Sequence, residues 1–506
     1  MGPQKLFGIL LAVMLLLGVI TWGTTFAESS VHEPPPHPSK GASSLIAGVP
    51  DEDAGNIQSA GVIDVIMGVP GWGLKPSTNI YFSQATNNSD TPEEDDHYGY
   101  AVASGDFDRN GIYDIAIGVP GENKWSGAVN VIYFFADGSS VQYFLAEKEL
   151  FANASDGDAF GTALVAGDFD GDGYDDLAVS APWYDDNDGA VFLLYGSASS
   201  DPGLGLSGYD VFHGEDQERF GMSLARADFD ANGIYDLAVG CPNADVGILT
   251  TIRSGKVRIL YGPLDAGFVR HQDWTQSATG QGVSEEGDAF GETLVTGDFN
   301  GDGRADLAIG VPDEAQGDVT DSGAVNVLYN DQHDLNKTGA KVWFMGGAQE
   351  NKHTGFSLAA GDFNGDGSDD LVIGSPFADS AAKKNAGRVD VIWGAPATKD
   401  VTTFLPPNNK FGFLGYALLG INLTGYDHDD LVMGVPGFSS PGHTRDGAIA
   451  VSYGGVSGLN SQLQIITQNE LAQVAAEDFD YFGSALAERP PKHPSDYALF
   501  APMIRR

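Results

Sequence analysis

The stretch Asp106-Phe-Asp108-Arg-Asn110-Gly-Ile-Tyr-Asp114 decides the fold, because the same acidic pattern begins again at Asp168, Asp228, Asp298 and Asp362. Each copy has an oxygen-bearing side chain at positions 1, 3, 5 and 9 and a glycine at position 6. This spacing lets a short backbone turn surround a hard cation with oxygen atoms, and calcium suits it best. An apolar stretch that ends in Pro follows each copy.

The acidic loops belong to a repeat of about sixty residues, since their starts lie 62, 60, 70 and 64 residues apart. One unit contains Phe160-Gly161, the loop 168–176, an apolar stretch to Pro182, and further apolar stretches at 189–195 and 209–213, which predicts four short strands. A single four-stranded sheet cannot cover both of its faces, so repeated sheets pack face to face, and a closed ring leaves no exposed end. The repeat therefore predicts an all-β fold, a β-propeller.

The two ends of the chain complement each other. Residues 45–52 resemble the end of a second strand, and residues 60–68 resemble a third strand, whereas Phe482-Gly483 and residues 496–502 resemble inner strands. Six complete units plus one blade shared by the two termini predict seven blades. Eight blades stay open as an alternative, because residues 64–70 also read as the end of a second strand.

Composition excludes some classes of partner. The 506-residue chain has a net charge of −44, so it lacks the clustered Lys and Arg that nucleic-acid binding requires. Cys241 is the single cysteine, so no intramolecular disulfide can form, and its Gly-Cys-Pro context predicts a small buried residue.

The first residues have the pattern of an export signal. Lys5 precedes an apolar stretch at 6–20, and Thr25-Phe-Ala27 resembles a cleavage site, so residues 1–27 are predicted to be a signal peptide. An uncleaved membrane anchor is the alternative. Residues 28–44 are predicted to be a Pro- and Ser-rich linker and residues 45–506 the propeller, which gives a secreted protein without a membrane span in its mature form. Sequons at Asn87, Asn153, Asn336 and Asn422 would carry glycans only in a eukaryotic secretory pathway.

The Phe-Gly start, the Asp-rich loop and the Gly-Val-Pro end resemble the FG-GAP repeat, as found in the β-propeller of integrin α subunits. That resemblance implies seven blades, calcium in the turn between strands 1 and 2 of several blades, and ligands on the opposite face. Carried over by position, the implied side-chain ligands are Asp106, Asp108, Asn110 and Asp114; Asp168, Asp170, Asp172 and Asp176; Asp228, Asp230, Asn232 and Asp236; Asp298, Asn300, Asp302 and Asp306; and Asp362, Asn364, Asp366 and Asp370. The implied carbonyl donors are Ile112, Tyr174, Ile234, Arg304 and Ser368.

Two further copies depart from this pattern. Asn422, Thr424 and Tyr426 occupy ligand positions in the sixth, and residues 488–494 have lost the loop, so we expect no calcium in either. The chain also lacks the regions that accompany such repeats in integrins and in the glycosylphosphatidylinositol-specific phospholipase D family, so we expect a free-standing propeller.

We expect the five calcium ions to be structural. A complete shell of protein oxygens leaves no open position for a substrate, whereas metal catalysis requires one. No nucleophile elbow, zinc-protease motif or phosphate loop occurs in the chain, so an enzyme is the less favoured class.

The loops that follow each Pro should emerge on the face opposite the calcium loops. They contain large aromatic residues that are candidates for ligand binding, namely Trp72, Trp125, Trp183, Tyr184, Phe377 and Phe438. The alternative is that these rings fold back as local core. The favoured function is a binding or adhesion module for a protein or cell-surface ligand; a glycan-binding lectin is the second candidate and a polysaccharide lyase the third.

Overall fold

The computed structural model describes residues 41–53, 57–85, 91–136, 140–146, 154–197, 204, 208–246, 253–264, 269–330, 334–381, 383–394, 401–408, 410–471 and 478–490. The chain divides into two compact units, Met1–His37 and Pro38–Arg506, and all described residues lie in the second. The predicted signal peptide and most of the predicted linker lie outside the described residues.

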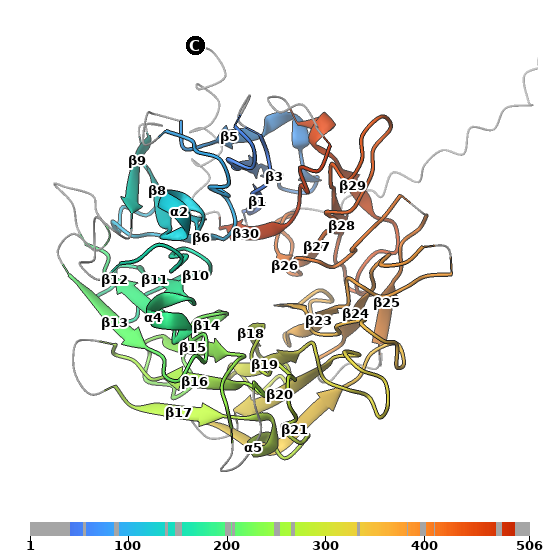
Figure 1. The fold of residues 1–506 in the computed structure, drawn as a ribbon. Coiled ribbons are helices and arrows are strands. Elements are labelled where there is room, and N and C mark those ends of the chain that lie inside the picture. The colour runs from blue at the N-terminus through green and yellow to red at the C-terminus, as the bar shows by residue number, and fades with distance from the viewer. Residues whose placement is uncertain are drawn as a thin grey trace, which may run out of the picture. The chain divides into compact units, whose positions relative to one another are not determined.

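The described part of the second unit contains seven four-stranded antiparallel sheets (Figure 1). Their innermost strands follow one another around the ring as β6, β10, β14, β18, β22, β26 and β30, and each contacts the next. Because β30 also contacts β6, the ring is closed. The chain is therefore a seven-bladed β-propeller, as the repeat predicts.

The strands are given from the centre outward, with blades numbered in chain order. Blades 1 to 3 contain β6 (Val102–Gly105), β7 (Asp114–Val119), β8 (Ala128–Phe134) and β9 (Ser140–Ala146); β10 (Leu164–Gly167), β11 (Asp176–Ala181), β12 (Ala190–Leu194) and β13 (Tyr209–His213); and β14 (Leu224–Ala227), β15 (Asp236–Cys241), β16 (Lys256–Leu260) and β17 (His271–Trp274). Blades 4 to 6 contain β18 (Leu294–Gly297), β19 (Asp306–Val311), β20 (Ala324–Asn330) and β21 (Leu335–Trp343); β22 (Ser357–Gly361), β23 (Asp370–Gly374), β24 (Val389–Ile392) and β25 (Val401–Phe404); and β26 (Leu418–Ile421), β27 (Asp430–Gly434), β28 (Ile449–Ser452) and β29 (Gln464–Ile466). Blade 7 contains β30 (Ala485–Arg489), β1 (Ser44–Val49), β2 (Val62–Ile66) and β5 (Ile80–Phe82). Short helical turns are α2 (Glu122–Trp125), α4 (Tyr184–Asn187), α5 (Gln276–Thr279), η1 (Pro76–Thr78) and η3 (Gln468–Glu470).

Blade 7 joins the two ends of the described chain. Its inner strand β30 pairs with β1, so that Leu45 lies opposite Glu488 and Ala47 opposite Leu486. The predicted shared blade is thus confirmed, although the second C-terminal stretch proposed for it, 496–502, lies outside the described residues. Glu488 lies within β30 and not at the start of a loop.

The alternative of an eighth blade is wrong. Gly68–Val69 does not end a second strand; it forms β3, which pairs with β4 (Gly73–Leu74) in a small hairpin between β2 and β5. We call residues 68–74 the blade-7 hairpin.

The Phe-Gly start of each unit closes the gap between neighbouring blades. The Phe160 ring is fully buried and packs in a cluster with residues of blade 1, such as Val129, and of blade 2, such as Val179. Gly161 has φ +96°, and a Cβ on Gly118 of the preceding blade would lie 2.0 Å from its carbonyl oxygen. Only glycine permits that approach, so the repeated motif is a packing element.

The two ends of the ring differ because strands within a blade alternate in direction. Turns between strands 1 and 2 lie on one end, which we call the loop face. Loops between strands 2 and 3 lie on the other, which we call the mouth face; it is turned toward the viewer in Figure 1, where α2 and α4 lie in front. Among the described residues, no helix is long and apolar enough to cross a bilayer.

Candidate functional site

The five acidic loops share one hydrogen-bond pattern. The position-1 carboxylate accepts the N–H of the position-6 glycine, with N···O distances of 2.7 to 3.2 Å, in the pairs Asp106–Gly111, Asp168–Gly173, Asp228–Gly233, Asp298–Gly303 and Asp362–Gly367. The position-5 side chain accepts the N–H of position 7, in the pairs Asn110–Ile112, Asp172–Tyr174, Asn232–Ile234, Asp302–Arg304 and Asp366–Ser368. These bonds turn the backbone tightly around one point.

The position-9 aspartates bind the backbone as well as facing that point. Each is fully buried and accepts two N–H groups; Asp370, for example, accepts from Phe363 at 3.1 Å and from Gly394 at 2.9 Å. Burial raises the pKa of Asp370 to about 7 and that of Asp114 to about 9. Burial therefore disfavours the ionised form of these carboxyl groups, and a nearby positive charge would offset that cost.

Three carboxylates converge in each of the second and third loops. In each, the carboxylate oxygens of positions 1, 3 and 9 all lie within 4.8 Å of one another, in the sets Asp168, Asp170, Asp176 and Asp228, Asp230, Asp236. Carboxylates this close repel one another unless a cation lies between them. The first loop differs, because Asn110 Nδ2 donates to Asp108 at 2.8 Å and to the Phe134 carbonyl at 2.9 Å. Carboxylate and amide oxygens are nevertheless the donor set that calcium prefers, so these residues fit that ion.

Neighbouring acidic loops are also tied to each other. The backbone N–H of Asp106 in blade 1 donates to the Asp175 carboxylate in blade 2 at 2.7 Å. The same link joins Asp298 to Asp369 at 2.8 Å and Asp362 to Asp429 at 3.1 Å. These hydrogen bonds couple the conformation of one acidic loop to that of the loop in the next blade.

The sixth loop is held by protein contacts. Asn422 Oδ1 accepts the Gly425 N–H at 2.6 Å, and its Nδ2 donates to the Tyr426 carbonyl at 2.5 Å. The Thr424 carbonyl accepts the N–H of Gly71, which lies in the blade-7 hairpin, at 2.7 Å. The Asn422 side chain is thus engaged within the loop.

The other predicted sequons are not in acidic loops. Asn336 lies in β21, and Asn87 and Asn153 lie outside the described residues.

The same hairpin corrects the predicted position of Trp72. Because Gly71 bonds to the sixth loop, the hairpin and Trp72 lie on the loop face and not on the mouth face. The error comes from reading Gly-Val-Pro at 68–70 as the end of a second strand. Trp72 is nonetheless 76% exposed.

The other aromatic candidates follow second strands, as predicted, but differ in exposure. Trp125 is 44% exposed, whereas Phe438 is only 8% exposed and packs on Phe411, with ring centroids 5.3 Å apart. Tyr184 packs on Phe192 at 5.8 Å, and Trp183 lies under the Arg219 guanidinium at 5.6 Å. These environments leave Trp125 as the most accessible ring of the predicted set on this face.

Phe377 belongs to an aromatic group near the axis. Its ring lies 5.4 Å from Phe356, which lies 5.1 Å from Tyr416 in the next blade. We call the opening beside these two rings the central mouth.

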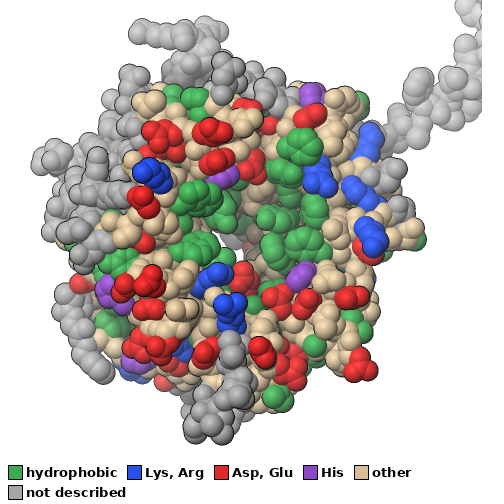
Figure 2. Space-filling model, in the orientation of Figure 1, with side chains coloured by type: hydrophobic (Ala, Val, Ile, Leu, Met, Phe, Trp, Pro, Cys, Tyr) green, Lys and Arg blue, Asp and Glu red, His purple; other side chains and the backbone are tan. Residues whose placement is uncertain are grey.

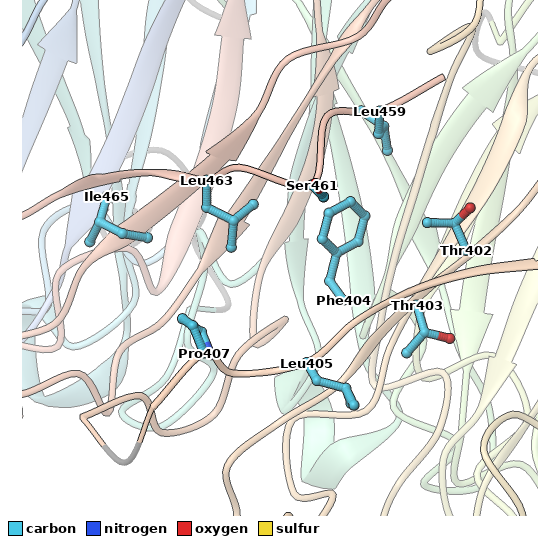
Figure 3. Close-up of a pocket in the computed structure, with 9 residues that line it drawn as sticks. All are labelled: Thr402, Thr403, Phe404, Leu405, Pro407, Leu459, Ser461, Leu463 and Ile465. Carbon is cyan, nitrogen blue, oxygen red and sulfur yellow. The ribbon is translucent and has the colours of Figure 1, made fainter. Parts of the chain in front are cut away.

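The central mouth is a cavity of ≈ 300 Å³ formed by five blades. Its lining residues are Pro50, Asp51, His97, Tyr100, Glu292, Thr293, Phe356, Tyr416 and Ser484. Figure 2 shows hydrophobic side chains gathered around the centre of this face, with acidic side chains on the loops outside them. A second hollow, between the outer strands of blades 5 and 6, is lined mainly by apolar side chains such as Phe404 and Leu463 (Figure 3).

Charged groups line the central mouth beside the aromatic rings. His97 Nδ1 lies 3.3 Å from Asp51, and outside the lining residues His353 Nδ1 lies 2.8 Å from Asp313. Burial, together with the nearby Asp313 carboxylate, raises the pKa of Glu292 to about 7. The mouth therefore combines electron-rich rings with carboxylates, which suits a positively charged group.

The sequence contains a signal for this mouth that its analysis missed. Tyr100, Glu292, Phe356, Tyr416 and Ser484 each follow the glycine at the same position of their unit, as in Tyr98-Gly99-Tyr100. Residues at one position of a repeat converge on the axis once the ring closes, so reading this position across all units would have found the mouth.

The FG-GAP repeat model matches the chain in four places, residues 98–132, 160–194, 290–328 and 354–392. The curated relatives include phosphatidylinositol-glycan-specific phospholipase D from Bos taurus, which is 32% identical over 247 residues, or 45% of this chain and 28% of the relative. Integrin alpha pat-2 from Caenorhabditis briggsae is 31% identical over 283 residues, or 49% of this chain and 21% of the relative. The matched region is thus less than a third of either relative.

Solved structures similar to this chain include a mutant of AofleA from Arthrobotrys oligospora, with a TM-score of 0.36, 12% identity and coverage of 73% of this chain and 89% of that one. The Dos1 propeller has a TM-score of 0.35 and 12% identity and covers 72% and 83% of the two chains.

Proposed function

We propose that this chain, which carries FG-GAP repeats in a seven-bladed propeller, is a binding module with structural calcium on its loop face and a protein ligand on its mouth face. The central mouth carries the proposal, because it brings aromatic rings and half-buried carboxylates from five blades together at one opening. A basic side chain of a protein ligand, Arg or Lys, matches both features.

The calcium ions would act on the loop face as links between blades. The side-chain ligands would be the residues at positions 1, 3, 5 and 9 of the five loops, with the position-7 carbonyls completing each shell. Their oxygens are preorganised by the bonds to Gly111 and its equivalents, and the loops of adjacent blades are joined through Asp175, Asp369 and Asp429. With an extracellular-type dissociation constant of about 10⁻⁴ to 10⁻³ M, millimolar calcium would contribute about 0.4 to 1.4 kcal/mol per site.

A secreted or cell-surface location accompanies this proposal. Calcium sites of that affinity fill only where calcium is millimolar, as outside cells. The signal-like segment at 1–27 supports the same location.

We favour a non-enzymatic role over a lyase or a phospholipase. The match to the Bos taurus phospholipase D covers 28% of that protein, so its activity does not transfer to this chain. The carboxylates of the loops are engaged with backbone N–H groups, which suits a structural ion better than an open catalytic one.

A displayed peptide library tests the protein-ligand proposal. Peptides selected on the calcium-loaded protein should be enriched in Arg or Lys. Their affinity should fall about tenfold on Tyr416→Ala and on Glu292→Gln, because each change removes about 1–2 kcal/mol of cation–π or charge attraction. Thr162→Ala, at the same repeat position in a blade that does not line the mouth, serves as the matched control.

Two outcomes would contradict the proposal. Selected peptides that bind the variants and the wild type equally would remove the mouth from consideration. A glycan-array signal that free sugar competes, and that Trp125→Ala abolishes while the mouth variants keep it, would favour the lectin instead.

A further inference from the structure

Three sets of buried polar side chains occur on the mouth face, outside the acidic loops. Each set contains a Gln that follows strand 4 of one blade and an Asp and a Glu of the next blade. The sets are Gln84, Asp96 and Glu122; Gln276, Asp288 and Glu314; and Gln468, Asp480 and Glu52. All nine side chains are buried. We call them the junction triads.

The triads repeat a fixed spacing. The Gln residues 84, 276 and 468 are 192 residues apart, as are the Asp residues 96, 288 and 480, and Glu122 and Glu314 are separated by the same interval. The geometry repeats as well, because Gln Nε2 donates to Glu Oε2 at 2.9, 2.6 and 2.7 Å in the three sets. One local structure is thus built at three of the seven blade junctions.

Two members of the first triad, Asp96 and Glu122, belong with the exposed Glu93 to a group that could hold a cation. Oxygens of Glu93, Asp96 and Glu122 all lie within 4.8 Å of one another. Asp96 and Glu122 are buried, so their mutual repulsion is little screened by water.

The second triad contains a buried acceptor that nothing in the protein satisfies. The Gln276 side chain is fully buried, its amide lies on the Glu314 carboxylate, and its Oε1 accepts no hydrogen bond. Gln468 Oε1 in the third triad is likewise buried and without a donor. A half-turn of the carboxamide would bring Oε1 beside the Glu oxygen, a position that is favourable only with a cation or a proton between the two oxygens.

At two other blade junctions, a lysine side chain of the protein supplies a positive charge where the proposed cation would lie in the triads. At the position of Asp96, blade 3 has Glu218, whose carboxylate lies 2.6 Å from Lys256 Nζ. Blade 5 has Lys352 at that position, and its buried ammonium group donates to the carbonyls of Met345 and Gly347. Both junctions have Ala, at 244 and 378, where the triads have Glu. These two junctions therefore have a lysine ammonium group in the region where the triads have carboxylates.

We propose that the junction triads bind hard divalent cations, as a second class of site distinct from the acidic loops. Carboxylate and amide oxygens from two blades would supply the ligands, Asp and Glu from one blade and Gln Oε1 from the preceding one. Calcium or magnesium suits this oxygen-only donor set.

A cation at these positions would control the central mouth. Asp51 and His97 line the mouth and are adjacent in sequence to the triad residues Glu52 and Asp96. Asp313, which bonds to His353, is adjacent to Glu314. Filling the triads would therefore hold the loops that present the mouth.

The cation content of the full chain tests the proposal. Protein stripped with a chelator and dialysed against millimolar calcium is measured by mass spectrometry of the metal. The triple variant Glu52→Gln, Glu122→Gln, Glu314→Gln should hold three fewer ions than the wild type. Glu218→Gln, a buried carboxylate already paired with Lys256, is the matched control and should hold the wild-type number. Equal metal content in the triple variant and the wild type overturns the proposal.

Diffraction from wild-type crystals soaked in manganese provides a measurement that does not depend on a variant that folds. Anomalous peaks are expected at all three triads. Peaks at the acidic loops without any at the triads would overturn this inference and leave the loop sites intact. In solution, the variant Asp228→Asn separates the two classes of site, because it should lose one loop ion only.

Discussion

The sixth loop allows the metal-independent role of the position-9 aspartate to be measured. Asp430 is fully buried and accepts the N–H of Leu423 and that of Gly454, each at 2.9 Å. Asp430→Ala leaves both donors without an acceptor. Each buried, unsatisfied donor costs about 1–3 kcal/mol, so we expect a loss of about 2–6 kcal/mol in the free energy of unfolding.

The assay is chemical denaturation in calcium and in chelator, with Asp370→Ala in the fifth loop as the matched variant. Asp370 makes the same two bonds, to Phe363 and Gly394, but is also a proposed calcium ligand. We expect the Asp430→Ala loss to be equal in both solutions, because protein contacts alone hold that loop. The Asp370→Ala loss should be larger in calcium.

Two results would refute this reasoning. A loss below about 0.5 kcal/mol for Asp430→Ala would show that the buried N–H groups find other acceptors. A calcium-dependent loss at Asp430 equal to that at Asp370 would show that the sixth loop binds the ion as well.

The remaining predictions concern calcium, pH and the blade-7 hairpin. Chelation should lower the melting temperature and calcium should restore it; an unchanged curve after complete chelation would contradict calcium in the loops. In chelator, stability should fall as pH rises from about 4 through 7, because native Asp176 and Asp306, with pKa raised to about 7, retain protons that the unfolded chain has released; melting at pH 5 and pH 8 checks this, and calcium should reduce the difference. Affinity for a basic peptide should increase between pH 6 and 8 as Glu292 ionises, and a flat profile would remove that carboxylate from the site. Gly73→Ala should cost about 1–3 kcal/mol by denaturation, because φ is +76° and the new Cβ would lie 2.3 Å from the Tyr453 hydroxyl; no loss would show that the hairpin shifts freely.

The acidic loops and the blades could be predicted because their determinants are local. Each loop closes through bonds that span two to five residues, such as Gly111 N–H to Asp106, so residue type at fixed spacing is sufficient. The shared blade could also be predicted, because the two ends resemble complementary parts of one repeat.

Short motifs that match the repeat gave wrong predictions where the residues that pack against them differ from those in the other units. Val69-Pro70 has the form of a strand end but lies in a hairpin on the sixth loop, because β2 has already supplied the third strand of that blade. Phe438 has the position of a surface aromatic, yet its ring is buried against Phe411.

The sequence alone determined the repeat, the position of the acidic loops and the presence of a closed ring, since these depend on patterns that each unit contains within itself. Only the tertiary structure decided that Tyr100, Phe356 and Tyr416 form one mouth and that Gln276 reaches Glu314 of the next blade. Those contacts join residues of different blades, and their distances are set by how the blades pack around the axis and not by spacing along the chain.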